Sequence, residues 1–392
     1  MNNKLNPWPS YTQEEIQSVS QVLSSGQVNY WTGDQCKMFE KEFAYWCGSK
    51  YAITTSNGTT SLYLALKALA IGHGDEVIVT PRSFIASVSC VVNAGATPIF
   101  ADVDLNSGNI TAQTIREKIS DKTKAIICVH LAGYPCEMEA IMCLAKKHNI
   151  FVIEDCAQAH GAKYQEQSVG SIADIGCFSF CQDKIMTTGG EGGMVVTNHE
   201  ALWRIMWAFK DHGKSYSAVF EKDHPPGFRW LHESFGSNFR MTEMQAAIGR
   251  IQLTRMDDWH AKRTHNAKII MATLAKFPQL IFLPKIDKQV EHAWYKLYAY
   301  VQINGLANNW SRDRIVEEIN QLGVPCYSGS CSEIYLEKAF DQKFRPNERL
   351  ENARLLGETS LAFLVHPTLS SGDLEKTCSV LETILNLASK SI

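Results

Sequence analysis

The pattern of hydrophobic and polar positions divides the first half of the chain into short strands and longer helices. Apolar residues follow at helical spacing after Thr12, with Glu15 placed as in a capping box, and this pattern ends at Gly26. From Tyr51 onward, β-rich runs alternate with segments of helical length. The runs predict strands at residues 51–55, 76–80, 98–103, 124–130, 151–155, 175–180 and 194–197.

Helical spacing between these strands predicts helices at residues 59–70, 85–93 and 137–148. Such alternation indicates crossover connections and an α/β fold, with a largely parallel sheet covered by helices on both faces. Ligands bind at the carboxyl ends of the strands in sheets of this kind, so we expect functional residues directly after strands.

The pattern changes after residue 213, where an aromatic and charged stretch runs to residue 236. We predict one long helix from about Thr242 into the 270s and an amphipathic helix at 373–387. The predicted organisation is a large domain at residues 1–250 and a smaller C-terminal α/β domain at 251–392.

Composition restricts the possible partners. The 392 residues carry a formal net charge of −3, which gives no basic field for nucleic acid or an anionic membrane surface. No apolar run reaches the length of a bilayer, and the polar start MNNKLNPWPS does not resemble a secretory signal. The twelve cysteines are scattered without a CxxC pair, which favours free thiols and argues against a metal site. We therefore expect a cytoplasmic protein that binds small molecules.

Two turns that follow predicted strands are candidate binding residues. Gly58 and Thr59 lie at a strand-to-helix turn, where free backbone N–H groups and the helix dipole favour an anion, although a plain helix cap explains this turn more simply. Phe84 follows the next strand and could stack on a flat ring, although core phenylalanines are more common.

Two charged residues after later strands are candidates for chemistry. Asp155 ends a β-branched run, where a buried carboxylate needs a cation such as a protonated pyridine nitrogen; a helix cap is an equal alternative. Lys184 lies in a loop after the buried strand containing Ser179, and a partly desolvated lysine there would be nucleophilic. Most lysines, however, are simply solvated.

The order of these four features resembles the aspartate-aminotransferase-like enzymes that use pyridoxal phosphate (PLP). Within that class, the chain resembles the DegT/DnrJ/EryC1/StrS sugar aminotransferases over nearly its whole length. The motifs that carry the resemblance are NGTTSL, EDCAQAHGA, FSF followed by Lys184, EGGMVVTN and GSNFRMTEMQAA. This resemblance implies fold type I, with a mostly parallel mixed sheet between helices.

The resemblance also implies roles for individual residues. Gly58, Thr59 and Ser179 would hold the cofactor phosphate, and Asp155 would pair with the ring nitrogen. Gln158 would lie near the ring hydroxyl, Phe84 would stack on the ring, and Lys184 would form the Schiff base. Asn238 would reach the cofactor of the other subunit, which implies a homodimer with shared active sites.

Two departures from the family pattern concern the walls of the site. The family usually has one glycine before Glu-Gly-Gly, whereas this chain has Gly189 and Gly190. The segment 327–335 also differs from the usual tyrosine-proline pattern, so the substrate contacts there are not carried over.

The implied reaction is ping-pong transfer of an amino group, with L-glutamate as donor and a keto or aldehyde sugar as acceptor. A sugar 3-dehydratase would have histidine in place of Lys184, a noncatalytic relative would lack Lys184 or Asp155, and a nicotinamide enzyme would need a GxGxxG motif. The segments CQDKIMTTGGEGG and SCSEIYLEKAF resemble the branch that aminates C8 of oxidised 3-deoxy-octulosonate (8-oxo-Kdo) to give Kdo8N for lipopolysaccharide. A nucleotide-linked 4-keto or 3-keto sugar is the alternative acceptor.

Overall fold

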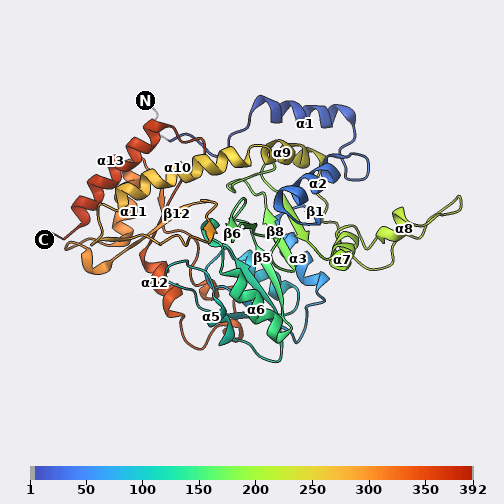
Figure 1. Ribbon diagram of the computed structural model, residues 1–392, viewed down its shortest axis with the longest axis horizontal. Helices are drawn as coiled ribbons and strands as arrows, with labels where there is room; N and C mark the ends of the chain where they lie inside the picture. Colours follow the sequence, from blue (N-terminus) through green and yellow to red (C-terminus); the bar gives the residue numbers. More distant parts are fainter. Residues whose placement is uncertain (1–4, 391–392) are drawn as a thin grey trace.

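A seven-stranded sheet forms the centre of the computed structural model, which describes residues 5–390 (Figure 1). The strand order is β1-β9-β8-β5-β4-β2-β3, and β9 alone runs against the other six. This is the mostly parallel sheet that the alternating pattern predicted. The strands are β1 Tyr51–Thr55, β2 Glu76–Val79, β3 Thr97–Phe100, β4 Thr123–Val129, β5 Phe151–Asp155, β8 Ile175–Ser179 and β9 Gly193–Thr197.

Helices cover both faces of this sheet. Alternate residues of β4 show why both faces need cover: Ile127 packs into the core under α3, α4 and α7, whereas Ile126 packs into a separate core with α6. A strand that is buried on both faces has a nearly continuous run of apolar residues, and this run is why the sequence pattern located β4. The helices are α1 Gln13–Ser25, α2 Gln35–Cys47, α3 Gly58–Ala68, α4 Ala86–Asn93, α5 Ala112–Arg116, α6 Met138–His148, α7 Glu200–Lys210, α8 Tyr216–Phe220, α9 Glu243–Leu253 and α10 Met256–Leu274.

A second, antiparallel sheet lies in the C-terminal part of the chain, in the order β10-β12-β14-β13. It packs with α10 and the C-terminal helices around a core of its own, on the side of the molecule where the C-terminus lies (Figure 1). The position of a domain boundary near residue 250 stays a prediction. The elements are β10 Ile281–Phe282, β12 Leu297–Val301, α11 Arg312–Gln321, β13 Cys326–Tyr327, α12 Glu351–Thr359, β14 Ser360–Phe363 and α13 Ser371–Ala388.

A small third sheet connects the two parts of the chain. Its strands are β6 Lys163–Tyr164, β7 Gln167–Ser168 and β11 Val290–Glu291, and β11 pairs with β6. Among the helices of residues 5–390, none is long and apolar enough to span a membrane.

The N-terminal helix was predicted correctly. The Thr12 N–H donates to Glu15 Oε2 over 2.6 Å, which closes one half of the expected capping box. Gly26 ends α1 in the left-handed region, at φ 68°.

The single helix predicted from Thr242 into the 270s is wrong, because α9 ends at Leu253 and α10 begins at Met256. At the break, the Thr254 and Arg255 N–H groups donate to carbonyls only three residues back, over 3.2 and 3.0 Å. The Arg255 side chain also turns toward α1, where it forms ion pairs with glutamates. These contacts between distant segments are not visible in the apolar periodicity, which continues through the break.

Candidate active site

The carboxyl ends of β1, β2, β5 and β8 surround a cavity of about 1120 Å³. Seven of the eight residues predicted for the site line this cavity: Gly58, Thr59, Phe84, Asp155, Gln158, Ser179 and Lys184. The eighth, Asn238, is exposed and is not among the residues that line it. Residues that line the cavity therefore follow four of the strands, as we expected from the sequence.

Asp155 provides a buried negative charge at the end of β5. Its carboxylate is 4% exposed and accepts hydrogen bonds from Ser87 Oγ over 2.7 Å and from the Ala157 N–H over 3.1 Å. Burial raises the pKa of this carboxyl, although the Ser87 hydrogen bond opposes the shift. Within residues 5–390 it has no ion-pair partner. A cationic ring nitrogen would supply the missing charge.

The start of α3 provides an anion site beside Ser179. The first amides of a helix, here those of Gly58 and Thr59, have no intrahelical acceptor and point out of the helix end. A Cβ at Gly58 would lie 2.5 Å from the Ser179 Cβ, so only glycine allows these two segments to approach so closely. Asn57 caps the helix by accepting from the Thr60 N–H over 2.9 Å. This geometry fits a phosphate group.

Lys184 lines the same cavity and is largely shielded from water, with 15% of its side chain exposed. Its Nζ is 3.6 Å from Asp183 Oδ1 and 5.0 Å from the centroid of the Tyr295 ring. The Phe84 side chain is 67% exposed although it lines the cavity, so its ring is available for stacking. These residues fit a flat, phosphorylated, cationic ring held next to an amine.

Gln158 is held by the backbone of a neighbouring loop. Its Oε1 accepts from the Ala132 N–H over 2.8 Å, so the side-chain oxygen is already engaged. The NH₂ group is then the part of the amide that remains to donate to a ring hydroxyl. The place of Gln158 near the ring hydroxyl stays a prediction.

The sequence alone missed several residues of the site. Ser87 had a weak signal, because it lies shortly after a predicted strand, where functional residues are expected; in the structure its hydroxyl donates to Asp155 and lies 2.9 Å from the Ser83 hydroxyl. Tyr295 and Lys296 precede β12, far along the chain, and carry no local signal. The segment 327–335, which departs from the family pattern, also reaches the cavity through Tyr327, Gly329, Ser330 and Cys331.

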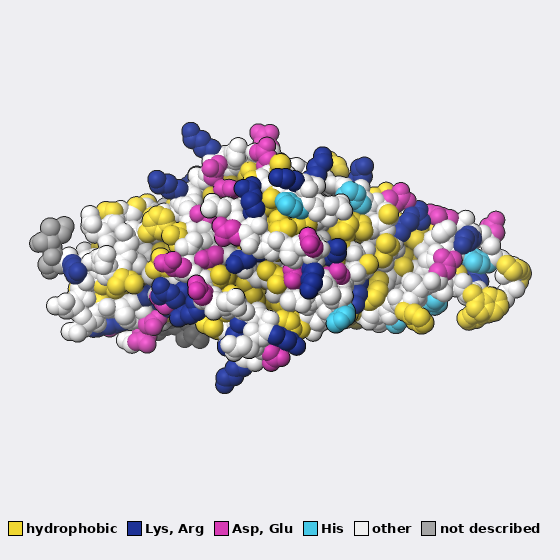
Figure 2. All heavy atoms as spheres, turned by 90° about the horizontal axis from the view of Figure 1, so that it is seen from below, with side chains coloured by type: hydrophobic (Ala, Val, Ile, Leu, Met, Phe, Trp, Pro, Cys, Tyr) yellow, Lys and Arg dark blue, Asp and Glu magenta, His cyan; other side chains and the backbone are white. Residues whose placement is uncertain are grey.

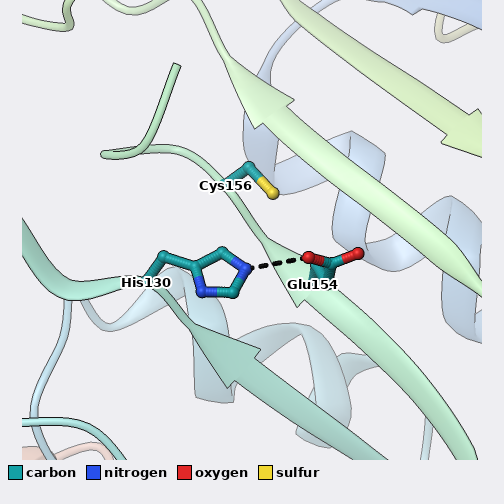
Figure 3. Close-up of side chains that lie close together, drawn as sticks. All are labelled: His130, Glu154 and Cys156. Atoms are coloured by element: carbon teal, nitrogen blue, oxygen red, sulfur yellow. Dashed lines mark hydrogen bonds and ion pairs between the residues drawn. The ribbon is translucent and has the colours of Figure 1, made fainter. Parts of the chain in front are cut away.

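A buried group of His130, Glu154 and Cys156 has ligand-like spacing but serves the structure (Figure 3). His130 Nδ1 accepts from the Cys136 N–H over 3.0 Å, so Nε2 carries the proton and donates to Glu154 over 3.0 Å. The Glu154 carboxylate also accepts from three backbone N–H groups, those of Gly170, Ile172 and Ala173. Burial raises the pKa of the Cys156 thiol, which keeps it protonated. The atoms that a metal would need are therefore already engaged.

The fold and the site together define a PLP-dependent aminotransferase of fold type I. The family model of the DegT/DnrJ/EryC1/StrS aminotransferases matches residues 9–382. The chain belongs to this family.

Individual relatives agree with this assignment. The chain is similar to an aminotransferase from Psychrobacter cryohalolentis, known from its X-ray structure, with 62% identity, a TM-score of 0.96 and coverage of 97% of this chain and 99% of that one. It is 42% identical to the GDP-perosamine synthase of Escherichia coli O157:H7, over 73% of this chain and 75% of the relative. The crystal structure of DesV from S. venezuelae is 28% identical, with a TM-score of 0.84 over 95% of this chain and 94% of that one.

Proposed function

We propose that this enzyme transfers an amino group from L-glutamate to a keto or aldehyde sugar in the cytoplasm, as a step of cell-surface polysaccharide or lipopolysaccharide synthesis. The observation that carries the proposal is that the cavity lined by Lys184 and Asp155 also has Tyr298, Ser330 and Glu337 in its wall, whose side chains carry hydroxyl and carboxylate groups. Sugar hydroxyls need such donors and acceptors. Relatives named for sugar amination, such as GDP-perosamine synthase, support the choice of a sugar.

When bound, PLP supplies an aldehyde that condenses with amines and a ring that accepts electrons from the bond being broken. The residues provide the positions and the protons. Asp155 would keep the ring nitrogen of bound PLP protonated, because its own buried charge needs a cation. The free amine of Lys184 would take a proton from the donor's α-carbon as a base and, as the resulting ammonium group, would give a proton back as an acid. The half-reaction with the amino donor and the half-reaction with the acceptor sugar would then use the same site.

For the acceptor we propose 8-oxo-Kdo, giving Kdo8N. Its support is the likeness of the segments around Lys184 and Cys331 to the branch that aminates C8 of this sugar. A nucleotide-linked 4-keto or 3-keto sugar is the second candidate, favoured by the relative named GDP-perosamine synthase. Glutamate-dependent turnover measured on both kinds of sugar separates them, and the better acceptor has the higher kcat/KM.

We also propose that the enzyme is a homodimer with shared active sites. Asn238 lies outside the cavity of its own chain, so its expected contact with a cofactor phosphate requires another subunit. The chain after α8 projects from the body at one end, and that end carries a group of hydrophobic side chains (Figures 1 and 2). Phe228, Trp230 and Phe235 of this segment are 79%, 81% and 100% exposed. Exposed aromatic residues of this kind are typical of subunit interfaces.

The first prediction tests the role of Lys184. Replacing it with alanine (Lys184→Ala) should lower kcat by about 10³-fold or more, because the amine that would bind the cofactor and move the proton is removed. PLP should still bind, but without the visible band of the lysine-bound form that borohydride removes. Lys163→Ala is the matched control, since this half-exposed lysine lies on β6 outside the cavity. Near-normal turnover in Lys184→Ala would disprove the assignment.

A further inference from the structure

A second cavity, of about 660 Å³, adjoins the active site. The two cavities share four wall residues: Asp183, Tyr295, Lys296 and Tyr327. The remaining walls of this side cavity come from the N-terminal segment 5–8, from Arg263 of α10 and from residues around Pro325 and His366. The two cavities therefore meet at these four residues, and Lys296 belongs to the wall of both.

Lys296 lies in the wall of both cavities, at the place where they meet. Within residues 5–390 its amine forms no hydrogen bond or ion pair, and it lies 5.3 Å and 4.9 Å from the ring centroids of Tyr295 and Tyr327. The nearby carboxylate of Asp183 is already engaged by the Tyr295 hydroxyl and by Lys184. Burial lowers the pKa of Lys296, and Lys184 and Arg263 add to this shift, while Asp183 opposes it. A partly buried cation without an ion pair is stabilised by an incoming anion.

Arg263 adds to the positive field of the side cavity. It is 1% exposed, and its Nη1 donates to the Trp294 carbonyl over 3.2 Å, whereas Nε and Nη2 have no partner within residues 5–390. Burial lowers its pKa to about 9, so the guanidinium remains charged at neutral pH. Burial lowers the pKa of His366 to about 4, so that ring is neutral. Two cations thus face one carboxylate, that of Asp183.

We propose that the side cavity binds an anionic group of the acceptor sugar and that Lys296 is the residue that contacts it. The proposal rests on the function proposed above and narrows the acceptor to one that carries anionic oxygens some distance from its carbonyl. A sugar carboxylate and a nucleotide diphosphate share this chemistry. Lys296 would thus determine specificity, while Lys184 carries out the reaction.

The test compares Lys296→Met, which removes the charge with little change of volume, with Lys296→Arg, which keeps it. Kdo and GDP serve as unreactive probes, titrated calorimetrically into the PLP-loaded enzyme. For the probe that resembles the true acceptor, affinity should fall about 10- to 100-fold in Lys296→Met. It should recover in large part in Lys296→Arg, and it should be unchanged in Lys163→Met.

Each outcome of the titration either supports or overturns the proposed anion site at Lys296. Loss of Kdo binding identifies a sugar carboxylate and loss of GDP binding identifies a diphosphate; both support an anion site at Lys296. Wild-type enzyme that binds neither probe, or Lys296→Met that binds them as wild type does, overturns it. The proposed function is checked separately: conversion of the visible PLP band by glutamate alone needs no acceptor, and its failure would reject aminotransfer rather than the anion site.

In kinetics, the same variant should raise KM for the acceptor more than it lowers kcat, because Lys296 binds the acceptor away from the reacting carbon. An uncharged carbonyl sugar should lose no affinity in Lys296→Met. An equal loss for charged and uncharged acceptors would show that Lys296 only supports the shape of the cavity, and would overturn the proposal.

Discussion

Asp155 shows how one residue can lower stability in the free protein and still serve the reaction. Its carboxylate is buried with two hydrogen bonds but without an ion-pair partner in the described part of the chain. Desolvation of a charge costs free energy, and that cost is offset only when a cation arrives. The same burial that raises the pKa of Asp155 therefore makes it a strong partner for a protonated ring nitrogen.

Asp155→Asn should lower kcat by about 100-fold or more, because an amide cannot hold the proton on the ring nitrogen. The PLP-free variant should in contrast be more stable than PLP-free wild type near pH 7, by about 1 kcal/mol. Since the folded pKa of Asp155 is raised, its ionised form destabilises the fold at pH values above the unfolded pKa, near 4. Thermal unfolding of both apoproteins across pH measures this difference.

The difference in stability between the PLP-free variant and the PLP-free wild type should become small as the pH falls below about 4, where Asp155 is protonated in both the folded and the unfolded chain. If the PLP-free variant is instead less stable near pH 7, the hydrogen bonds from Ser87 and Ala157 outweigh the desolvation of Asp155.

At the scale of single residues, the sequence predicted the site residues that directly follow strands. It did not predict the site residues that come from distant parts of the chain. Lys184, Asp155 and Gly58 each follow a predicted strand, and their order along the chain, which resembles the family, selected them; the ends of parallel strands then bring them to one cavity. Lys296 joins them from a turn before β12, more than a hundred residues after Lys184. No periodicity or motif in its neighbourhood distinguishes it from a solvated lysine.

At the scale of elements, the N-terminal segment 5–8 connects the catalytic loop to the C-terminal part of the chain. The Trp8 indole N–H donates to the Lys184 carbonyl over 2.8 Å, and the Trp8 ring stacks on His366 with centroids 6.1 Å apart. Asn6 Nδ2 donates to the Thr368 carbonyl over 2.9 Å. The loop of Lys184 is therefore held by residues that lie before α1 and after β14.

Trp8→Phe removes the indole N–H but keeps an aromatic ring against His366. We expect kcat to fall about three- to tenfold with little change in KM, because a loosened Lys184 is less well aligned for proton transfer. The pH at which the visible band of the lysine-bound cofactor changes should also shift. A change in thermal stability alone, with kcat and this pH unchanged, would show that Trp8 serves only packing.

The element order was predictable, but the direction of one strand and the end of one helix were not. The seven strands were visible because each is a short run rich in apolar and β-branched residues. The reversal of β9 depends on its pairing with both β1 and β8, which composition does not record. The break between α9 and α10 depends in the same way on the contact of Arg255 with α1.

At the scale of the whole molecule, the proposed dimer predicts that two inactive variants regain activity when they form mixed dimers with each other. Lys184→Ala and Asn238→Ala should each lose most activity as homodimers, because each site would draw one of these residues from each subunit. When equal amounts are unfolded and refolded together, about half of the dimers are mixed, and one of their two sites is intact. Activity should then approach about a quarter of the wild-type value.

Mixing the two variants without unfolding is the control, since intact dimers should exchange slowly and regain little activity. If the refolded mixture stays at the level of the separate variants, the sites are not shared through Asn238. If sedimentation measurements show that the enzyme is a monomer, a homodimer with shared active sites is excluded directly.

The walls of the active-site cavity come from separate parts of the chain. One part consists of the turns after β1, β2, β5 and β8, and the other consists of Tyr295, Lys296 and residues of the segment 327–335. Mutations in that segment can alter the shape offered to a new sugar while the reaction chemistry stays unchanged. Such a division allows selection, or a laboratory library restricted to one loop, to explore new acceptors without first losing a working catalyst.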